Sequence, residues 1–125
     1  MKFACACGNV IYDITDNLRY KAHFVSDEDY FNLLDEIDAS IEDFGTQAKA
    51  ASEANEQLSQ RDVENLIMKI RIAIGDAKRL MYQCSRCGRL YVDDHQRHLQ
   101  QFLAENPSRS EGILRSVKTT RDEAP

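Results

Sequence analysis

The four cysteines of this 125-residue chain fall into two short motifs, Cys5-Ala6-Cys7-Gly8 and Cys84-Ser85-Arg86-Cys87-Gly88. Two closely spaced thiolates followed by glycine are typical of a zinc knuckle, because glycine tolerates the positive φ of a tight turn. Two knuckles supply four sulfur ligands, which close a tetrahedral site and leave no position for water or substrate. The sequence therefore predicts one structural Zn²⁺ held by Cys5, Cys7, Cys84 and Cys87.

Two alternatives compete with this interpretation. A disulfide within the first cysteine pair would close a very small, strained ring, and cross-paired disulfides would require export from a reducing compartment. A mixed site could instead combine the second pair with His95 and His98. Its cysteine-to-histidine spacing is shorter than in a two-Cys two-His finger, and the first pair would be left without a metal.

Short runs of strand-forming residues surround both knuckles, and we expect them to pair as short antiparallel strands. These runs are residues 2–4, 10–12, 20–25, 79–83, 89–92 and 98–103. Asn106-Pro107-Ser108 indicates a turn, and Ile113-Leu114 a small apolar anchor.

A long amphipathic helix is expected from Asp27 to Phe44, with Ser26 as its N-cap and Gly45 as its end. Apolar residues recur along it at helical spacing. They are Tyr30, Leu33, Leu34, Ile37, Ile41 and Phe44.

The following residues, 46–59, are rich in Ala, Glu and Gln and indicate a partly helical connector. A second amphipathic helix is expected from Val63 to Ile74, stopping near Gly75. Residues 68–72 also alternate like a strand, but the helical period covers more residues.

The net charge of −5 conceals a strong asymmetry along the chain. Between Val25 and Glu64, twelve acidic residues stand against two basic ones, whereas the rest of the chain carries an excess of bases. The first expected helix holds two rows of acids, with no Lys or Arg from Asp27 to Phe44. These rows are Glu28, Asp35 and Glu42, and Asp29, Glu36 and Asp43.

Exposed helices usually intersperse lysines four residues from their acids, where the opposite charges stabilise the helix. A solvated face is the ordinary interpretation of such a helix. Rows of like charge nevertheless cost stability, and on that argument the pattern indicates a docking surface for a basic partner.

A basic cluster near the second knuckle suggests nucleic-acid binding. Its members are Lys78, Arg79, Arg86, Arg89 and Arg97. Arginines can equally stabilise four thiolates around Zn²⁺, which together carry a net charge of −2. The overall negative charge would also repel phosphate, so we do not expect nucleic acid to be the main partner.

Two segments carry a resemblance to a group of small bacterial proteins. The opening Cys-Ala-Cys-Gly-Asn-Val-Ile-Tyr-Asp and the later Tyr-Gln-Cys-Ser-Arg-Cys-Gly-Arg-Leu-Tyr-Val-Asp are similar to their CxCG and CxxCG zinc-ribbon motifs. Some proteins of this group look like immunity partners of secreted or contact-delivered toxins. The resemblance spans most of the chain, and it implies a zinc ribbon whose two halves are separated by a helical insertion.

We therefore expect an α+β fold: a four-cysteine zinc ribbon of short antiparallel strands with two or three inserted helices. A single domain would cover residues 1–117, with the insertion at about 26–78 and a disordered tail over 118–125. No signal-peptide core or membrane-length apolar run is visible, which favours the cytoplasm.

The sequence shows no nucleophile–base pair, phosphate loop or open metal site, so we expect a binding protein rather than an enzyme. The leading hypothesis is a cytoplasmic immunity protein whose acidic helical face covers a basic toxin domain, such as a nuclease. The alternative is a nucleic-acid-associated zinc ribbon acting in transcription or translation.

Overall fold

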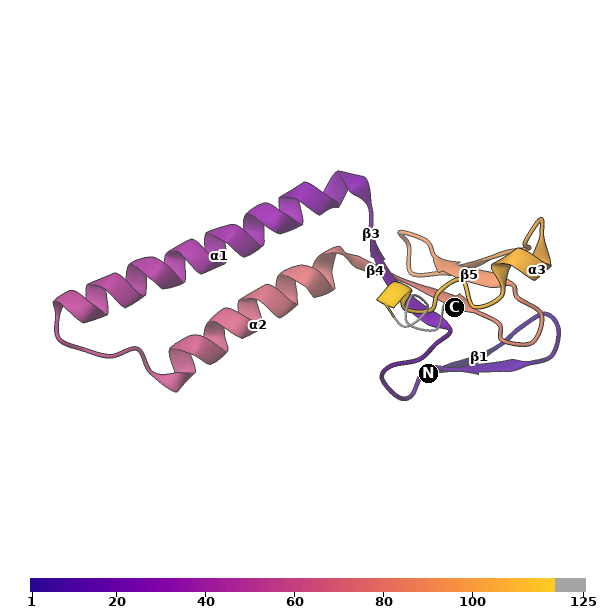
Figure 1. Cartoon of the computed structure of the whole chain (residues 1–125), viewed down its shortest axis with the longest axis horizontal. Helices are drawn as coiled ribbons and strands as arrows, with labels where there is room; N and C mark the ends of the chain where they lie inside the picture. The colour runs from indigo at the N-terminus through magenta and orange to yellow at the C-terminus, as the bar shows by residue number, and fades with distance from the viewer. Residues whose placement is uncertain (119–125) are drawn as a thin grey trace. The chain divides into compact units, whose positions relative to one another are not determined.

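The computed structural model describes residues 1–118 and confirms the predicted α+β class with short antiparallel strands (Figure 1). The elements are β1 (Lys2–Ala4), β2 (Val10–Tyr12), β3 (Lys21–Val25), α1 (Asp27–Glu53), α2 (Gln60–Ala77), β4 (Lys78–Gln83), β5 (Leu90–Asp93), β6 (Leu99–Phe102) and α3 (Pro107–Ser110). The tail predicted over 118–125 lies, beyond Lys118, outside the described residues.

The chain forms two compact units. Among the described residues, the ribbon unit comprises Met1–Phe24 and Arg79–Lys118, and the hairpin unit comprises Val25–Lys78. In sequence, the hairpin unit is thus an insertion that separates the two cysteine motifs.

The ribbon unit contains two small sheets. Strands β1 and β2 pair antiparallel with Phe3 opposite Ile11, and a second sheet has the order β3-β4-β5-β6. Within the second sheet β4 and β5 are antiparallel, with Tyr82 opposite Tyr91. Phe3 packs edge-on against both tyrosines, at centroid distances of 5.3 Å and 5.1 Å. The two sheets therefore share one aromatic core.

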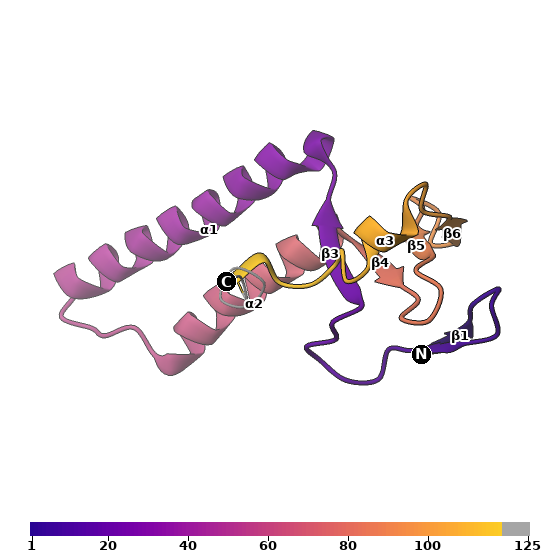
Figure 2. The same ribbon diagram turned by 45° about the vertical axis from the view of Figure 1, so that its right-hand side comes forward.

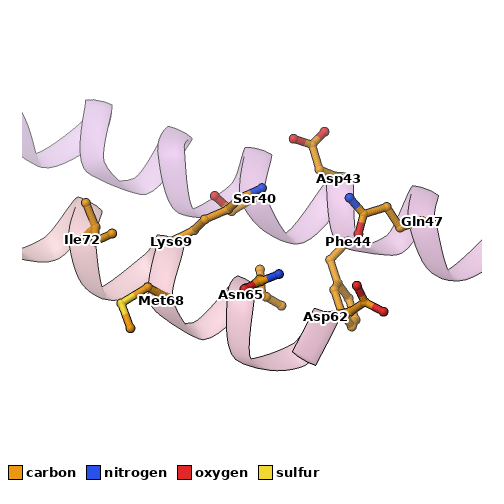
Figure 3. A pocket seen from close by; sticks show the side chains of 10 residues that line it. Ser40, Asp43, Phe44, Gln47, Asp62, Asn65, Met68, Lys69 and Ile72 are labelled. Carbon is orange, nitrogen blue, oxygen red and sulfur yellow. The ribbon is translucent and has the colours of Figure 1, made fainter. Parts of the chain in front are cut away.

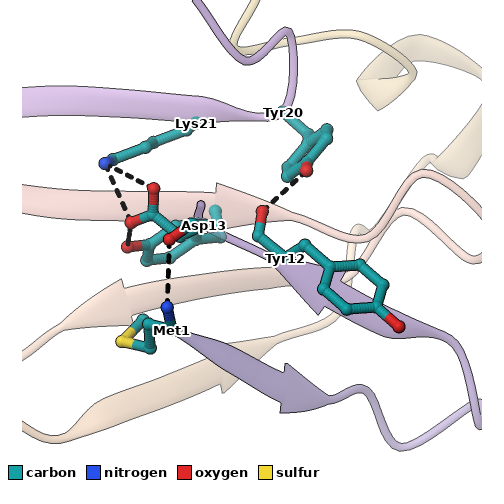
Figure 4. Close-up of polar contacts among 6 residues, drawn as sticks. Met1, Tyr12, Asp13, Tyr20 and Lys21 are labelled. Atoms are coloured by element: carbon teal, nitrogen blue, oxygen red, sulfur yellow. Dashed lines mark hydrogen bonds and ion pairs between the residues drawn. The ribbon is translucent and has the colours of Figure 1, made fainter. Parts of the chain in front are cut away.

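Asp13, just after β2, joins three strands of this unit (Figure 4). Its carboxylate accepts hydrogen bonds from the Lys21 ammonium at 2.9 Å and from the Tyr82 hydroxyl at 2.5 Å. Its backbone exchanges two hydrogen bonds with Met1. The bond from Lys21, and then that from Tyr82, lower the pKa of Asp13. Burial, reinforced by Asp13, raises the pKa of Tyr82 well above its usual range.

Helix α1 runs to Glu53, so the predicted end at Gly45 is wrong. Glycine costs a helix about 1 kcal/mol relative to alanine, which a long helix can absorb. The next eight residues are rich in good helix formers. In addition, Ala48 and Ala51 stay half-buried on the same stripe as Phe44. Ser26 is the N-cap residue, but its hydroxyl donates to the Asp29 carboxylate rather than accepting a backbone N–H.

Helix α2 starts at Gln60, three residues before the predicted start, and passes through Gly75. Ser59 and Asp62 form a capping box: the Ser59 hydroxyl accepts from the Asp62 N–H, and the Asp62 carboxylate accepts from the Ser59 N–H. This reciprocal cap fixes the start. The helical interpretation of residues 68–72 is confirmed.

Helices α1 and α2 lie side by side as an antiparallel hairpin in both ribbon views (Figure 1, Figure 2). Within Val25–Lys78, all of which the structure describes, Leu33 is the one buried side chain. Ile37, Phe44, Leu66 and Ile70 are half-buried. The hairpin therefore has a seam but little core of its own.

Three further features complete the described chain. The turn predicted at residues 106–108 is instead the start of the short helix α3. Ile113 is exposed, so it is wrong as an apolar anchor, whereas Leu114 is half-buried. Within residues 1–118, no helix is both long and apolar enough to cross a membrane.

Candidate metal centre

The four cysteine sulfurs meet at one point of the ribbon unit. Cys5 and Cys7 lie in the turn between β1 and β2, and Cys84 and Cys87 lie in the turn between β4 and β5. All four Sγ atoms lie within 4.8 Å of one another, with 3.5 Å between Cys5 and Cys87 and 3.7 Å between Cys7 and Cys84. The arrangement can hold a metal ion.

These distances fit a tetrahedral thiolate site. Metal–sulfur bonds of about 2.3 Å place the sulfurs of a tetrahedron roughly 3.8 Å apart. A disulfide requires about 2.05 Å, and all four cysteines are free thiols. The sulfur positions therefore match a shared ion and do not match the disulfide alternative.

The backbone of each knuckle closes a tight turn around its cysteines. The Gly8 N–H donates to the Cys5 carbonyl, and the Gly88 N–H donates to the Cys84 carbonyl, both at 2.9 Å. The two glycines have φ values of 94° and 82°, which side-chain-bearing residues rarely adopt. The glycine after each cysteine pair is therefore required by the turn.

The residue after each glycine donates to a sulfur. The Asn9 amide lies 3.4 Å from Cys84 Sγ, and the Arg89 guanidinium lies 3.2 Å from Cys87 Sγ. Asn9 belongs to the first knuckle and Cys84 to the second, so this contact links the two. Such donors stabilise thiolates and orient them towards a metal.

Two of the cysteines, Cys84 and Cys87, have a lowered thiol pKa, whereas that of Cys7 is raised. Burial opposes the charged form of Cys84, but the backbone N–H of Cys87 and the Asn9 amide overcome it and lower its pKa to about 6. The backbone N–H of Arg89 lowers the pKa of Cys87. At Cys7, the Asn9 N–H favours the thiolate, yet lost hydration and the neighbouring thiols raise the pKa to about 11. Four thiolates this close therefore need a cation to neutralise them.

Two further side chains brace the knuckles. The Tyr91 hydroxyl accepts the Ala6 N–H at 3.1 Å, which holds β5 against the first turn. Buried Gln83 donates to the carbonyls of Gly88 and Ser110, and so ties the second turn to α3. Both contacts restrain the cysteine-bearing loops.

The histidine alternative finds no support in the geometry. His95 and His98 are exposed in the turn between β5 and β6, where the His98 N–H donates to the Asp94 carboxylate. Within residues 1–118, the four cysteines are the one cluster of three or more metal-ligating side chains of this kind.

The six predicted partner-binding acids are all exposed on α1: Glu28, Asp29, Asp35, Glu36, Glu42 and Asp43. The second row borders the seam with α2. Asp29 and Glu36 line a hollow with Asp76, and Asp43 lines a groove of about 310 Å³ with Lys69 and Met68 (Figure 3). The first row lies further around the helix, away from α2.

Two members of the basic cluster make contacts within the ribbon unit. Arg79 donates to the Asp93 carbonyl and lies 4.7 Å from the centre of the Phe24 ring. Arg89 donates to Cys87, as expected for a base that stabilises a thiolate. Lys78, Arg86 and Arg97 are exposed.

Sequence reasoning missed Asn9, Asp13, Gln83 and Tyr91. Asn9 and Arg89 occupy equivalent places after the two knuckle glycines, and this parallel could have marked Asn9 as a donor to sulfur. Asp13, Gln83 and Tyr91 act through tertiary contacts, so no local signal reveals them.

The fold and the site define a zinc-ribbon-like α+β protein with four cysteines placed to hold a metal ion. The chain belongs to the family described as "Domain of unknown function (DUF8617)", whose model matches residues 1–110. This range includes all four cysteines and both long helices. No curated protein and no solved structure matches the chain.

Proposed function

We propose that this chain is a zinc-stabilised, non-catalytic protein-binding module whose acidic helix α1 docks a basic protein domain. In its specific form, the proposal is a cytoplasmic immunity protein that neutralises a basic bacterial toxin, such as a nuclease. This specific form rests on the resemblance of the two cysteine motifs to those of zinc-ribbon proteins that look like immunity partners.

The charge of α1 is the observation that carries the proposal. The helix holds nine acidic residues and one basic residue, Lys49. Within residues 1–118 the single ion pair joins Lys21 and Asp13, so none of these acids has a basic partner there. Unneutralised rows of like charge destabilise a helix, and a basic partner would relieve the repulsion.

A nuclease domain fits this surface by its own chemistry. Proteins that bind nucleic-acid backbones carry clusters of Lys and Arg. Rows of carboxylates spaced along a helix offer the same sign of charge as a phosphate backbone. Binding there would occupy the basic residues that the toxin needs for its substrate.

Zinc is the metal that best suits the site and the compartment. Four thiolates at tetrahedral spacing favour Zn²⁺ or an iron–sulfur centre, and a closed four-sulfur zinc site is typically structural. Metal analysis of purified protein tests this, with one zinc per chain as the expected result. A bound iron–sulfur chromophore would overturn the zinc assignment.

The docking proposal is tested with the product of the neighbouring gene as partner. The variant Asp35→Lys, Glu36→Lys, Glu42→Lys, Asp43→Lys should raise the dissociation constant at least about 100-fold, with the larger part of the loss in the association rate at low salt.

A matched control applies the same change of charge outside the two rows, at exposed Asp16, Glu56, Glu64 and Glu105. It should weaken binding much less. If both variants lost the same affinity, the effect would come from net charge alone and not from the two rows. Unchanged affinity of the first variant would overturn the docking proposal.

The nucleic-acid alternative predicts a different result. Salt-sensitive retention of DNA or RNA, lost on Arg86→Glu and Arg97→Glu, would favour it. Two members of the basic cluster, Arg79 and Arg89, already hold structural contacts, which weakens that alternative.

A further inference from the structure

The hairpin unit leaves a row of large apolar side chains in water. Three lie on α1 and three on α2, with exposed fractions from 36% to 50%. They are Tyr30, Leu34 and Ile41, and Val63, Ile67 and Ile74. This row is separate from the acidic rows that carry the proposed function.

Both helices repeat the same spacing. On α1 the apolar positions alternate in steps of four and three residues, and α2 follows the same pattern. The series are Tyr30, Leu34, Ile37, Ile41, Phe44, and Val63, Ile67, Ile70, Ile74. Such spacing is the a/d pattern of coiled coils and helix bundles. Two helices of one hairpin thus each carry a bundle seam that their mutual contact only half covers.

The exposed positions of the two helices lie on one face of the hairpin. Viewed down each helix from its N-terminus, these residues are rotated by roughly 50–100° from those that contact the other helix. The direction of the rotation is the same on both helices. In an antiparallel pair, that offset points both sets to the same side. The opposite face holds the groove with Ser40, Gln47 and Asn65, where polar residues mix with Met68 and Ile72 (Figure 3).

The apolar area of this face is close to the apolar share of a standard dimer interface. The six side chains together expose on the order of 500 Å² of apolar surface, close to the largest patch of an ordinary monomer. A standard interface buries roughly 800 Å² per partner, of which about 56–65% is apolar. The face therefore supplies about the apolar share of one such interface.

We propose that a second copy of this chain covers the face, so that two hairpins form a four-helix bundle around a two-fold axis. An identical hairpin supplies helices with the same spacing of apolar residues, and a two-fold contact buries the same face on both copies. The acidic rows lie outside this face and remain accessible in the dimer.

The charges of α1 and α2 determine which helices lie side by side in the dimer. Helix α1 carries nine acids and one base, whereas α2 carries three of each. Two α1 helices placed side by side would repel. The axis therefore runs along the bundle, which sets α1 beside the α2 of the second copy and keeps the two α1 helices diagonal.

This arrangement brings one opposite-charge pair together. Glu36 lines a hollow with Ala73, and Ser40 lines a groove with Lys69. The members of each pair therefore lie at similar heights along the axis of the hairpin. By the same register Asp38 is level with Arg71, and both are exposed at the edge of the apolar face. In the bundle, Asp38 of one copy lies beside Arg71 of the other.

Sedimentation equilibrium of the full chain tests the proposal. The wild type should show twice the 14.3 kDa of one chain at micromolar concentration. Ile41→Asp should weaken dimerisation at least about 100-fold, because it buries a carboxylate in the interface. Ile72→Asp is the matched control: Ile72 is 54% exposed on the opposite side of α2, and its change should leave the dimer intact.

The charge pair gives a second test that does not disturb the apolar face. Asp38→Arg alone should weaken the dimer about 10-fold, and adding Arg71→Asp should restore it. A wild type that stays at 14.3 kDa at 100-fold higher concentration would overturn the proposal. So would equal effects of Ile41→Asp and Ile72→Asp. If Ile41→Asp fails to fold, the charge pair decides, and a double variant no better than Asp38→Arg overturns the packing.

Discussion

The ribbon unit and the hairpin unit solve the problem of a small core in different ways. The ribbon unit gathers five buried apolar side chains, and two of them, Cys5 and Cys84, are metal-ligand candidates. The hairpin unit buries Leu33 alone. In the first unit a bound ion can supply the missing stabilisation. The second has no such group, and its apolar side chains stay open to a partner.

The local structure of the two units follows the same division. The ribbon unit is made of strands of three to six residues, which have little stability unless their neighbours are fixed. The hairpin unit consists of helices of 27 and 18 residues, whose backbone hydrogen bonds are formed within each helix. The strands should therefore depend on a bound metal more directly than the helices do.

Metal removal should separate the units with the largest effect. A structural zinc contributes on the order of 10 kcal/mol that is coupled to folding. We expect Cys84→Ser, or chelation, to abolish amide protection in β1, β2, β4 and β5, measured by hydrogen exchange with mass spectrometry. Protection in α1 and α2 should persist at concentrations at which the proposed dimer forms.

Ser85→Ala, an exposed change in the same turn, is the control and should leave metal content and protection unchanged. A Cys84→Ser protein with full metal content and an unaltered melting temperature would show that the site does not contribute to the stability of the ribbon unit.

Asp13 offers a second way to weaken the ribbon unit alone. Asp13→Ala leaves the buried Tyr82 hydroxyl without its acceptor, and should cost about 2–3 kcal/mol of unfolding free energy in denaturant titrations. Asp16→Ala, three residues on and exposed, should cost far less.

The pH dependence of this contribution has a definite sign. Because the folded-state pKa of Asp13 is lower than its usual value of 3.8, its stabilisation is complete above that value. It is lost as the pH falls through the folded-state value. The wild type and Asp13→Ala should therefore converge in stability under strong acid, and a constant difference down to that range would contradict the assignment.

The candidate metal site was predictable because its determinants are local. Cysteine spacing and the following glycine encode each knuckle, and four such sulfurs can serve one ion wherever the chain brings them together. The flanking strands were likewise encoded in short β-forming runs. The Asp13 contacts with Lys21 and Tyr82 join residues 8 and 69 positions apart, so they follow from the fold rather than from a motif.

The end of α1 shows where local signals mislead. Gly45 resembles a helix stop, but the stop fails because Phe44, Ala48 and Ala51 continue the stripe that faces α2. Tertiary packing outweighs the modest cost of one glycine. The periodicity of α1 did locate its apolar side, yet half of that side proved exposed. A sequence pattern marks a face as apolar and does not say what covers it.

The donors to sulfur should have an intermediate effect confined to the ribbon unit. Arg89→Gln removes the charged contact at 3.2 Å from Cys87 and should lower metal affinity about 10–100-fold in chelator competition. Asn9→Ala should act in the same direction through Cys84. Arg86→Gln removes an equal charge from an exposed position in the second knuckle and serves as control. Equal affinities for the Arg89 and Arg86 variants would show that only general charge matters.

A glycine-to-alanine substitution, made at one position in each unit, should change stability least. Its effect should have opposite signs in the two units. A methyl group added at Gly45 meets nothing within 4 Å, and the residue lies inside α1. Gly45→Ala should therefore stabilise the hairpin unit by about 0.5–1 kcal/mol, since alanine loses less backbone freedom on folding.

Gly88→Ala is the counterpart in the ribbon unit, where φ is 82° and an alanine is strained by about 1–2 kcal/mol. Thermal unfolding followed by helical circular dichroism and by metal release should report opposite signs for the two variants. If Gly45→Ala destabilises the helical signal, then the chain bends or ends at that position in solution. The continuous helix to Glu53, and with it the length of the face that we assign to the dimer, would then have to be given up.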